Sequence, residues 1–325
     1  MKKWISIALA ALLVLALSVS AGAEVKEYII ATSLATGDTL PRAYDWFAEE
    51  LKNRSGGTLV GTCYHDCQLG AQGDYITSLQ LDSIQVAESS TSLLGNIDSK
   101  FMIFDIPYVC SSIEDCQAKL DAGLGQLLSD ALEEKTGIVI VGWMIRTPRN
   151  VYSSTHPIKS IEDFNGMVIR TMDTKPVMTA FELLKATPVF ISGTERYMAL
   201  QTGVVDAAEN SSSEILVKKE YEVTKYLSLT EHMIVPNPIC VSADWFYSLT
   251  EEEQALVREV GYEAGLLGTQ YELEGLEETE AALAEAGMEI NTLDEETKAA
   301  IRAAVEPMYE DYFDQIGEEV WAYFL

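Results

Sequence analysis

Short apolar runs alternate with amphipathic segments along most of the chain, most clearly between residues 164 and 210. Residues 167–169 are apolar but too few for a helix, so they suit a buried strand that ends on Arg170. Thr174 can cap the next helix, with Pro176 in the first turn, where a missing N–H is tolerated. The pattern then predicts strands at 189–191 and 204–208, separated by a helix with a capping box at Ser192 and Glu195.

Strands that alternate with helices predict right-handed βαβ units and a parallel sheet covered on both faces. In such sheets, ligands bind beyond the carboxyl ends of the strands. Arg170 and Asn210 each fall at or just after the end of an expected strand, so we expect them at one edge of the sheet. A guanidinium fork and an amide at the same edge suit a carboxylate or another planar anion.

The same patterns extend over the rest of the chain. A helix expected from Thr250 to residue 286, with Glu253 completing a capping box, would be about 50 Å long at 1.5 Å per residue. Gly123 and Gly125 lie within a helical pattern and predict a helix junction, whereas residues 236–238, Pro-Asn-Pro, predict a rigid non-helical link. Further strands are expected at 27–31, 58–64, 84–87, 137–145, 226–229 and 239–242, and further helices after Asp38 and at 75–79, 113–134, 213–223 and 295–316.

Residues 1–23 have the composition of a secretory signal peptide. Lys2 and Lys3 precede an apolar run over residues 4–19, and the Ala-Gly-Ala of residues 21–23 supplies a cleavage site. The alternative is a retained membrane anchor, for which the apolar run is short. We therefore expect cleavage after Ala23 and a soluble protein exported to a periplasm.

The chain is strongly acidic, with a net charge of −29. Such a charge repels nucleic acid and anionic membrane surfaces, so we expect neither as a partner. An anion site must then be a local positive exception, which makes each arginine at a strand end informative. Arg146, which follows the expected strand 137–145, is a second such arginine, and its alternative role is a structural ion pair with one of the many acids.

The five cysteines predict disulfides, because the chain is expected to enter an oxidising compartment. Cys63 with Cys67 and Cys110 with Cys116 are close pairs in sequence, but four cysteines allow three connectivities and the sequence does not choose among them. Cys240 lies in an apolar strand and is expected to be a buried free thiol.

Signatures of catalysis and of metal binding are weak. Cys63, His65 and Cys67 alternate along a strand and could face one metal ion, but no fourth ligand is apparent, so we expect no metal site. The sequence contains no H-E-x-x-H, no P-loop and no G-x-S-x-G. We therefore expect neither an enzyme nor a cofactor.

Three segments resemble the core signature of a known family. GMVIRTMD at 166–173, ERYMALQTGVVDAAEN at 195–210 and YEVTKYLSLTEH at 221–232 are similar, in order and spacing, to the DctP-type solute-binding proteins of TRAP transporters. The resemblance extends over most of the chain. It implies an α/β, two-lobed periplasmic-binding-protein fold with parallel or mixed sheets, a hinge between the lobes and a long lobe-spanning helix. Lobe I would comprise 24–143 and 236–275, and lobe II 144–235 and 276–325.

The resemblance also assigns ligand-binding roles. In this family the arginine equivalent to Arg170 anchors the substrate carboxylate, the asparagine equivalent to Asn210 contacts ligand, and a second arginine at the place of Arg146 often does. Glu88 aligns near a position where it would accept a hydrogen bond from a substrate hydroxyl or ammonium, and its alternative is a solvated loop acid. The chain departs from the family at Ala208, where many members have Gln.

Together these features imply a periplasmic receptor that captures a small organic anion, a carboxylate, and delivers it to TRAP membrane subunits. A monomer is the family default. Two alternatives share the fold: a receptor for a sulfonate, and a ligand-sensing partner of a membrane sensor kinase. The sequence does not choose the anion.

Overall fold

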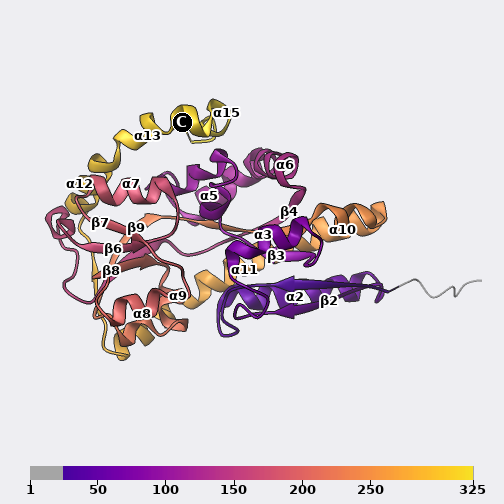
Figure 1. Cartoon of the computed structure of the whole chain (residues 1–325), viewed down its shortest axis with the longest axis horizontal. Coiled ribbons are helices and arrows are strands. Elements are labelled where there is room, and N and C mark those ends of the chain that lie inside the picture. Colours follow the sequence, from indigo (N-terminus) through magenta and orange to yellow (C-terminus); the bar gives the residue numbers. More distant parts are fainter. Residues whose placement is uncertain (1–24, 325) are drawn as a thin grey trace, which may run out of the picture.

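Two β-sheets flanked by helices form the framework of the protein, in a computed structural model that describes residues 25–324. In Figure 1 the labels β6 to β9 of the second sheet gather on one side of the molecule and those of the first sheet on the other. The expected α/β class with mixed sheets is therefore confirmed. The expected signal peptide at 1–23 lies outside the described residues. Between residues 25 and 324, no helix is both long and apolar enough to cross a membrane.

The first sheet has the strand order β2-β1-β3-β10-β4. Strand β1 pairs in parallel with β2 and β3, whereas β10 lies between β3 and β4 and runs antiparallel to both. The helix α2 connects β1 to β2; the Asp38 side chain accepts from the N–H of Thr39 at its start, as the sequence predicts. The strands are β1 (Lys26–Ala31), β2 (Leu59–Tyr64), β3 (Val86–Glu88), β4 (Ile138–Ile145) and β10 (Pro236–Ser242), and the helices between them include α2 (Thr39–Arg54), α3 (Gln72–Gln80) and α4 (Thr91–Leu94).

The second sheet has the order β11-β9-β5-β8-β6-β7. Strand β6 pairs in parallel with β7 and β8, as the βαβ pattern predicts, whereas β5 runs antiparallel to β8 and β9. In Figure 1, α7 lies on one side of β6 to β8, and α8 and α9 lie on the other. The strands are β5 (Arg149–Ser153), β6 (Val168–Thr171), β7 (Thr187–Phe190), β8 (Ala207–Asn210), β9 (Tyr226–Met233) and β11 (Glu289–Thr292), and the helices are α7 (Lys175–Leu183), α8 (Arg196–Gln201) and α9 (Ser212–Val217).

Local signals explain where the helices of this sheet begin. Thr174 caps α7 by accepting from the N–H of Val177, as expected. The capping box expected at Ser192 is wrong, because α8 begins at Arg196 and the Ser192 hydroxyl bonds Thr194 instead. Ser192 has the sequence spacing of a helix cap, but its hydroxyl makes a local hydrogen bond in the turn before the helix.

The longest helix, α11 (Glu251–Glu285), begins at the expected capping box of Thr250 and Glu253. It packs on α2 and β4 of the first sheet and on α9 and β11 of the second, so the expected helix spanning both halves is present. Glycines make the contact with β4 close: a Cβ on Gly265 would lie 2.6 Å from the Trp143 carbonyl oxygen, and one on Gly261 would lie 2.6 Å from that of Val141. Only residues without a side chain allow the helix to lie directly on the strand.

Two regions expected to be helical are each divided into shorter helices. The region 113–134 divides into α5 (Ile113–Lys119) and α6 (Gly125–Thr136) around Gly123, which has φ 119°, so the expected junction is confirmed. The region 295–316 divides into α12 (Glu295–Val305), α13 (Pro307–Asp311) and α14 (Phe313–Ile316), and Pro307 begins the second of these. The last helices, α14 and α15 (Glu318–Trp321), pack on the 3-10 segment Ser99–Asp105 beside the first sheet.

The chain passes between the sheets at short connections. Residues 146–148 join β4 to β5, and residues 234–235 join β9 to β10. The non-helical conformation expected at 236–238 is confirmed, but these residues already belong to β10, where Pro236 and Pro238 pair with Ile145 and Trp143 of β4. Proline is tolerated there at the start of the strand.

All five cysteines of the described part are free thiols. Cys240 is fully buried in β10, as expected. Cys63 and Cys67 make separate contacts, with the Tyr44 and Ser33 carbonyl oxygens, whereas the thiols of Cys110 and Cys116 lie in contact. The disulfides therefore stay a prediction.

Candidate functional site

The four residues selected from the sequence all lie buried at strand ends. Glu88 ends β3, Arg146 follows β4, Arg170 lies in β6 and Asn210 ends β8. Their exposed fractions are 0%, 6%, 3% and 7% in that order. Buried ionisable and amide groups of this kind require partners, so the partners decide what each residue can do.

Arg170 has a guanidinium nitrogen that makes no hydrogen bond, unlike Arg146. Its Nε donates to the Ile191 carbonyl oxygen at 2.7 Å, and its Nη1 is buried without a partner. Among residues 25–324, no carboxylate lies within ion-pair distance of Arg170. Its guanidinium is thus fixed in direction by one bond and leaves donors available to an anion.

The charge on Arg170 is also unbalanced. Burial, followed by the neighbouring positive charge of Arg196, lowers the pKa of Arg170 to about 10, and Glu209 only partly opposes this. The side chain remains a cation at neutral pH, since its pKa is still well above 7. A bound anion would relieve both the desolvation and the repulsion.

Arg146 is held by acids of the protein itself. Its Nη2 lies 2.5 Å from Asp38 Oδ2, its Nη1 lies 3.6 Å from Glu214 Oε2, and Nη1 also donates to Ser211 Oγ at 3.2 Å. Burial opposes its charge, but Asp38, Glu272 and Glu214 outweigh burial and raise the pKa of Arg146. These contacts correspond to the alternative that the sequence left open for Arg146, a structural ion pair.

An ion-pair network extends from Arg146 through both sheets. Glu214 lies 3.4 Å from Arg196, which pairs with Glu220 at 2.6 Å. Burial raises the pKa of Asp38 to about 6 despite its pairing with Arg146, whereas the two arginines outweigh burial at Glu214 and lower its pKa to about 2. The network contains two arginines and three acids, so it leaves no free positive charge and is a support rather than an anion site.

Glu88 is buried beside this network. The Ser33 N–H donates to its Oε1 at 2.7 Å and the Ser33 hydroxyl donates to the same oxygen, while Oε2 is buried without a partner. Burial outweighs these bonds and raises the pKa of Glu88 to about 7. The alternative of a solvated loop acid is wrong, because the side chain is fully buried.

Asn210 faces Asn150 across the β5–β8 pair, and its Oδ1 accepts from the N–H of Ser211 at 2.9 Å. That bond directs the oxygen toward the backbone, so the amide NH2 is the group left to face the sheet edge. The preceding residue, Glu209, pairs with Arg149 and lies 3.7 Å from His232 Nε2. Burial raises the pKa of Glu209, but the charge and hydrogen bonding of Arg149 outweigh burial and lower the pKa to about 2.

Several buried polar atoms in or beside β3 and β6 have no hydrogen-bond partner. Besides Arg170 Nη1 and Glu88 Oε2, the hydroxyls of Ser89, Thr91 and Thr171 are buried without partners. An open groove of about 950 Å³ lies elsewhere, between Tyr108 and Arg302, and none of the four selected residues lines it. The unpaired polar atoms therefore lie apart from this groove.

Sequence reasoning missed several residues of the site. Asp38 was expected only as a helix cap, yet its Oδ1 caps Thr39 while its Oδ2 binds Arg146. Arg149 was missed because β5 was not expected, although it follows Arg146 by three positions at the start of that strand. A search for arginines that could face Glu209 across a neighbouring strand would have found it.

Two β-sheets flanked by helices, with a buried and partly unpaired arginine at a strand end, are the architecture of a receptor for small organic anions. The chain belongs to bacterial extracellular solute-binding protein family 7, whose model matches residues 30–316. The family expectation from the sequence is confirmed.

Proteins of known structure or description share this fold. A solute-binding protein of Sulfitobacter sp. strain NAS-14.1 is 32% identical over 274 residues, which cover 83% of this chain and 82% of that protein. The structure of a TRAP periplasmic solute-binding protein of Sulfitobacter sp. NAS-14.1 with bound β-D-galacturonate has 29% identity and TM-score 0.87, and covers 92% of this chain and 99% of that chain. One from Sulfurospirillum deleyianum with bound succinate has 25% identity and TM-score 0.85, over 90% and 96%.

Proposed function

We propose that this receptor binds its anion through a carboxylate on Arg170 and delivers it to TRAP membrane subunits in a periplasm, after cleavage at Ala23. The buried, unpaired Nη1 of Arg170 is the observation that carries the proposal. A carboxylate can accept two parallel bonds from a guanidinium fork, and the burial of this site strengthens them. Asn210 supplies a second contact through its amide NH2.

Arg146 and Glu88 take supporting roles in this proposal. Arg146, through Asp38 and Ser211, fixes the strand ends around the solute. Glu88 Oε2 accepts from a solute hydroxyl or ammonium. A sulfonate is less well suited than a carboxylate, because one free guanidinium leaves its third oxygen unpaired.

The unpaired polar groups in or beside β3 and β6 favour a hydroxylated carboxylate such as a sugar acid. The unpaired hydroxyls of Ser89, Thr91 and Thr171 and the free oxygen of Glu88 suit several solute hydroxyls. A second carboxylate, as in succinate, would meet Glu88 and the other acids near Arg146. The galacturonate complex of the Sulfitobacter protein supports the sugar-acid class.

Access to the site requires motion of the two halves, because its residues are 7% exposed or less. We propose that lobe I (24–143 and 236–275) and lobe II (144–235 and 276–325) of a monomer separate about the connections 146–148 and 234–235. A solute that contacts both halves then favours the closed arrangement.

The test is a thermal-shift panel on residues 24–325 with galacturonate, galactonate, succinate and a small sulfonate. A solute at a thousand times its dissociation constant stabilises by about 4 kcal/mol, and the midpoint of unfolding should rise by several degrees. Arg170→Ala should abolish the shift, whereas Arg258→Ala, which removes an arginine stacked on Phe246, should retain it. Equal shifts in both variants would show that Arg170 does not bind the solute.

A further inference from the structure

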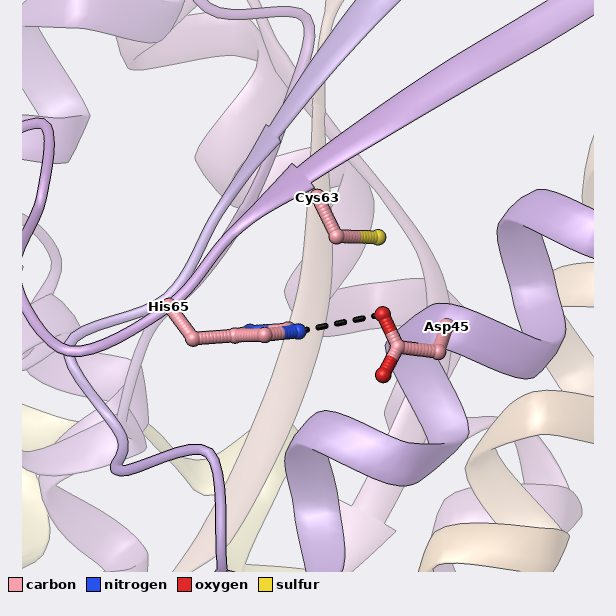
Figure 2. A group of neighbouring side chains, drawn as sticks. All are labelled: Asp45, Cys63 and His65. Atoms are coloured by element: carbon pink, nitrogen blue, oxygen red, sulfur yellow. Dashed lines mark hydrogen bonds and ion pairs between the residues drawn. The ribbon is translucent and has the colours of Figure 1, made fainter.

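Three side chains with metal-binding atoms converge between α2 and β2, on the face of the first sheet (Figure 2). Asp45 lies in α2, Cys63 lies in β2 and His65 follows the end of that strand. Their ligand atoms, a carboxylate oxygen, a sulfur and an imidazole nitrogen, all lie within 4.8 Å of one another. This spacing is compatible with three corners of one tetrahedral coordination sphere, whose bonds are about 2.0–2.3 Å long.

The imidazole of His65 is already oriented for coordination. Its Nδ1 hydrogen-bonds to Thr32 Oγ1 at 2.9 Å, and its Nε2 points at Asp45 Oδ1 at 3.0 Å, as Figure 2 shows for the second of these. A partner on one ring nitrogen fixes the ring and leaves the other nitrogen for a cation, the arrangement that ordinary metal sites use. His65 is buried, so the orientation does not depend on solvent.

Without a cation, a thiolate on Cys63 and the carboxylate of Asp45 would repel each other. Their ligand atoms lie within 4.8 Å of each other, where two like charges disfavour one another. A divalent cation reverses that relationship, because thiolate and carboxylate both bind it and a coordinating thiol loses its proton. Binding would form a sulfur–metal bond and release the thiol proton to water, so no oxidant or reductant takes part.

The ligand set differs from the one the sequence suggested. Cys67 has φ 56° in a left-handed turn, and its sulfur contacts the Ser33 carbonyl oxygen at 3.4 Å rather than the other two side chains. Asp45 stands in its place, from a helix eighteen positions before Cys63 in sequence. Sequence spacing alone could not bring this carboxylate to the strand.

We propose that Asp45, Cys63 and His65 bind one thiophilic divalent cation of the zinc type, with water in the fourth position. Sulfur and imidazole ligands select against Mg²⁺ and Ca²⁺, which prefer oxygen. The carboxyl side chain of Asp45 is 58% exposed, which gives the cation and its water a path from solvent. The site joins α2 to β2, and Thr32, which orients His65, directly precedes the Ser33 that bonds Glu88.

The experiment uses residues 24–325 in a phosphine reductant, stripped of metal and titrated with Co²⁺ as a spectroscopic probe and with Zn²⁺. Native mass spectrometry should show one cation per chain, and Co²⁺ should give a thiolate-to-metal absorption band. Zn²⁺ should also raise the midpoint of thermal unfolding. A chain that gives no thiolate band and binds no Zn²⁺ would overturn the proposal.

Variants separate this ligand set from its neighbours. Cys63→Ser should lose the band, and Asp45→Asn, an exposed change that leaves folding intact, should weaken cation binding at least tenfold. Cys67→Ser is the matched control and should bind as the parent does. Loss of binding in Cys67→Ser with retention in Asp45→Asn would assign the cation to the Cys-x-His-x-Cys set instead and overturn the role of Asp45.

Discussion

The Arg149 side chain donates hydrogen bonds both to the carboxylate and to the backbone carbonyl of Glu209. Arg149 Nη2 donates to Glu209 Oε1 at 2.9 Å and to the Glu209 carbonyl oxygen at 2.9 Å, although sixty positions separate the two residues in sequence. The pair lies across the antiparallel strands β5 and β8 and is fully or nearly buried. It therefore fixes the backbone immediately before Asn210 and neutralises Glu209, an acid whose charge acts on Arg170.

Removal of this arginine should destabilise the protein strongly. Arg149→Met leaves the Glu209 carboxylate buried without its main partner, and such changes cost about 3–5 kcal/mol. Chemical unfolding in urea, followed by circular dichroism, measures the loss. The double variant Arg149→Met/Glu209→Met removes both charges and should recover most of the stability. A single variant within about 1 kcal/mol of the parent would contradict a buried, paired role.

Glu88 should make the protein less stable as pH rises from about 4 to 8. The carboxyl group has a folded pKa of about 7, above its unfolded value, so the folded state binds more protons in this window and stability falls as it ionises. A shift of that size corresponds to about 3 kcal/mol.

Glu88→Gln tests this linkage because it keeps the shape and removes the ionisation. Urea unfolding at several pH values from 4 to 8 should show a smaller decrease for the variant than for the parent. Asp38 and Asp105 also have raised pKa values and contribute to both proteins, so the difference between the two curves isolates Glu88. Parallel curves would show that Glu88 ionises normally.

The close contact of α11 with β4 predicts opposite effects of alanine at two glycines of one helix. In Gly265→Ala, the new Cβ would lie 2.6 Å from the Trp143 carbonyl oxygen and 2.8 Å from its nitrogen, so the helix must move. Overpacking of this kind costs about 1–3 kcal/mol. In Gly275→Ala, the nearest atom is Thr39 Cγ2 at 4.0 Å, and better helix propensity should stabilise by about 0.5–1 kcal/mol. Equal changes in the midpoint of thermal unfolding for the two variants would contradict the close contact between α11 and β4.

Cys110 and Cys116 are the cysteines best placed for a disulfide in an oxidising compartment. Contact with the Cys110 thiol, together with burial, raises the pKa of Cys116. Incubation with oxidised glutathione, followed by alkylation and peptide mass spectrometry, should find this pair linked. A loop of this length stabilises by about 2 kcal/mol. Cys110→Ser should remove that gain, while a linked Cys63–Cys67 peptide would contradict the assignment.

Local signals in the sequence were sufficient for much of the framework. Thr174 and Thr250 begin their helices as expected, and Gly123 interrupts its helix. Arg170 lies in a buried strand, and its Nη1 has no hydrogen-bond partner. These features depend on residues within a few positions of one another, so pattern and capping chemistry predict them.

Features that depend on distant pairing were not predictable in the same way. Strand β5 begins with polar Arg149 and Asn150 and is stable only because β8 and β9 lie on both sides of it. Asp38 becomes a partner of Arg146 only when two segments over one hundred positions apart meet. The network that supports the candidate site is thus a product of tertiary structure.

The place of β10 within the first sheet determines when that sheet can be completed. Because Pro236–Ser242 lies between β3 and β4, those two strands have no direct pairing and must wait for a segment made after most of the second sheet. The amino-terminal half therefore has no finished sheet while it is being synthesised, and its central contacts are long-range and slow to form. The first sheet therefore closes only when residues 236–242 are available, so its folding is coupled to that of the second sheet, whose strands β5 to β9 lie before them in the chain.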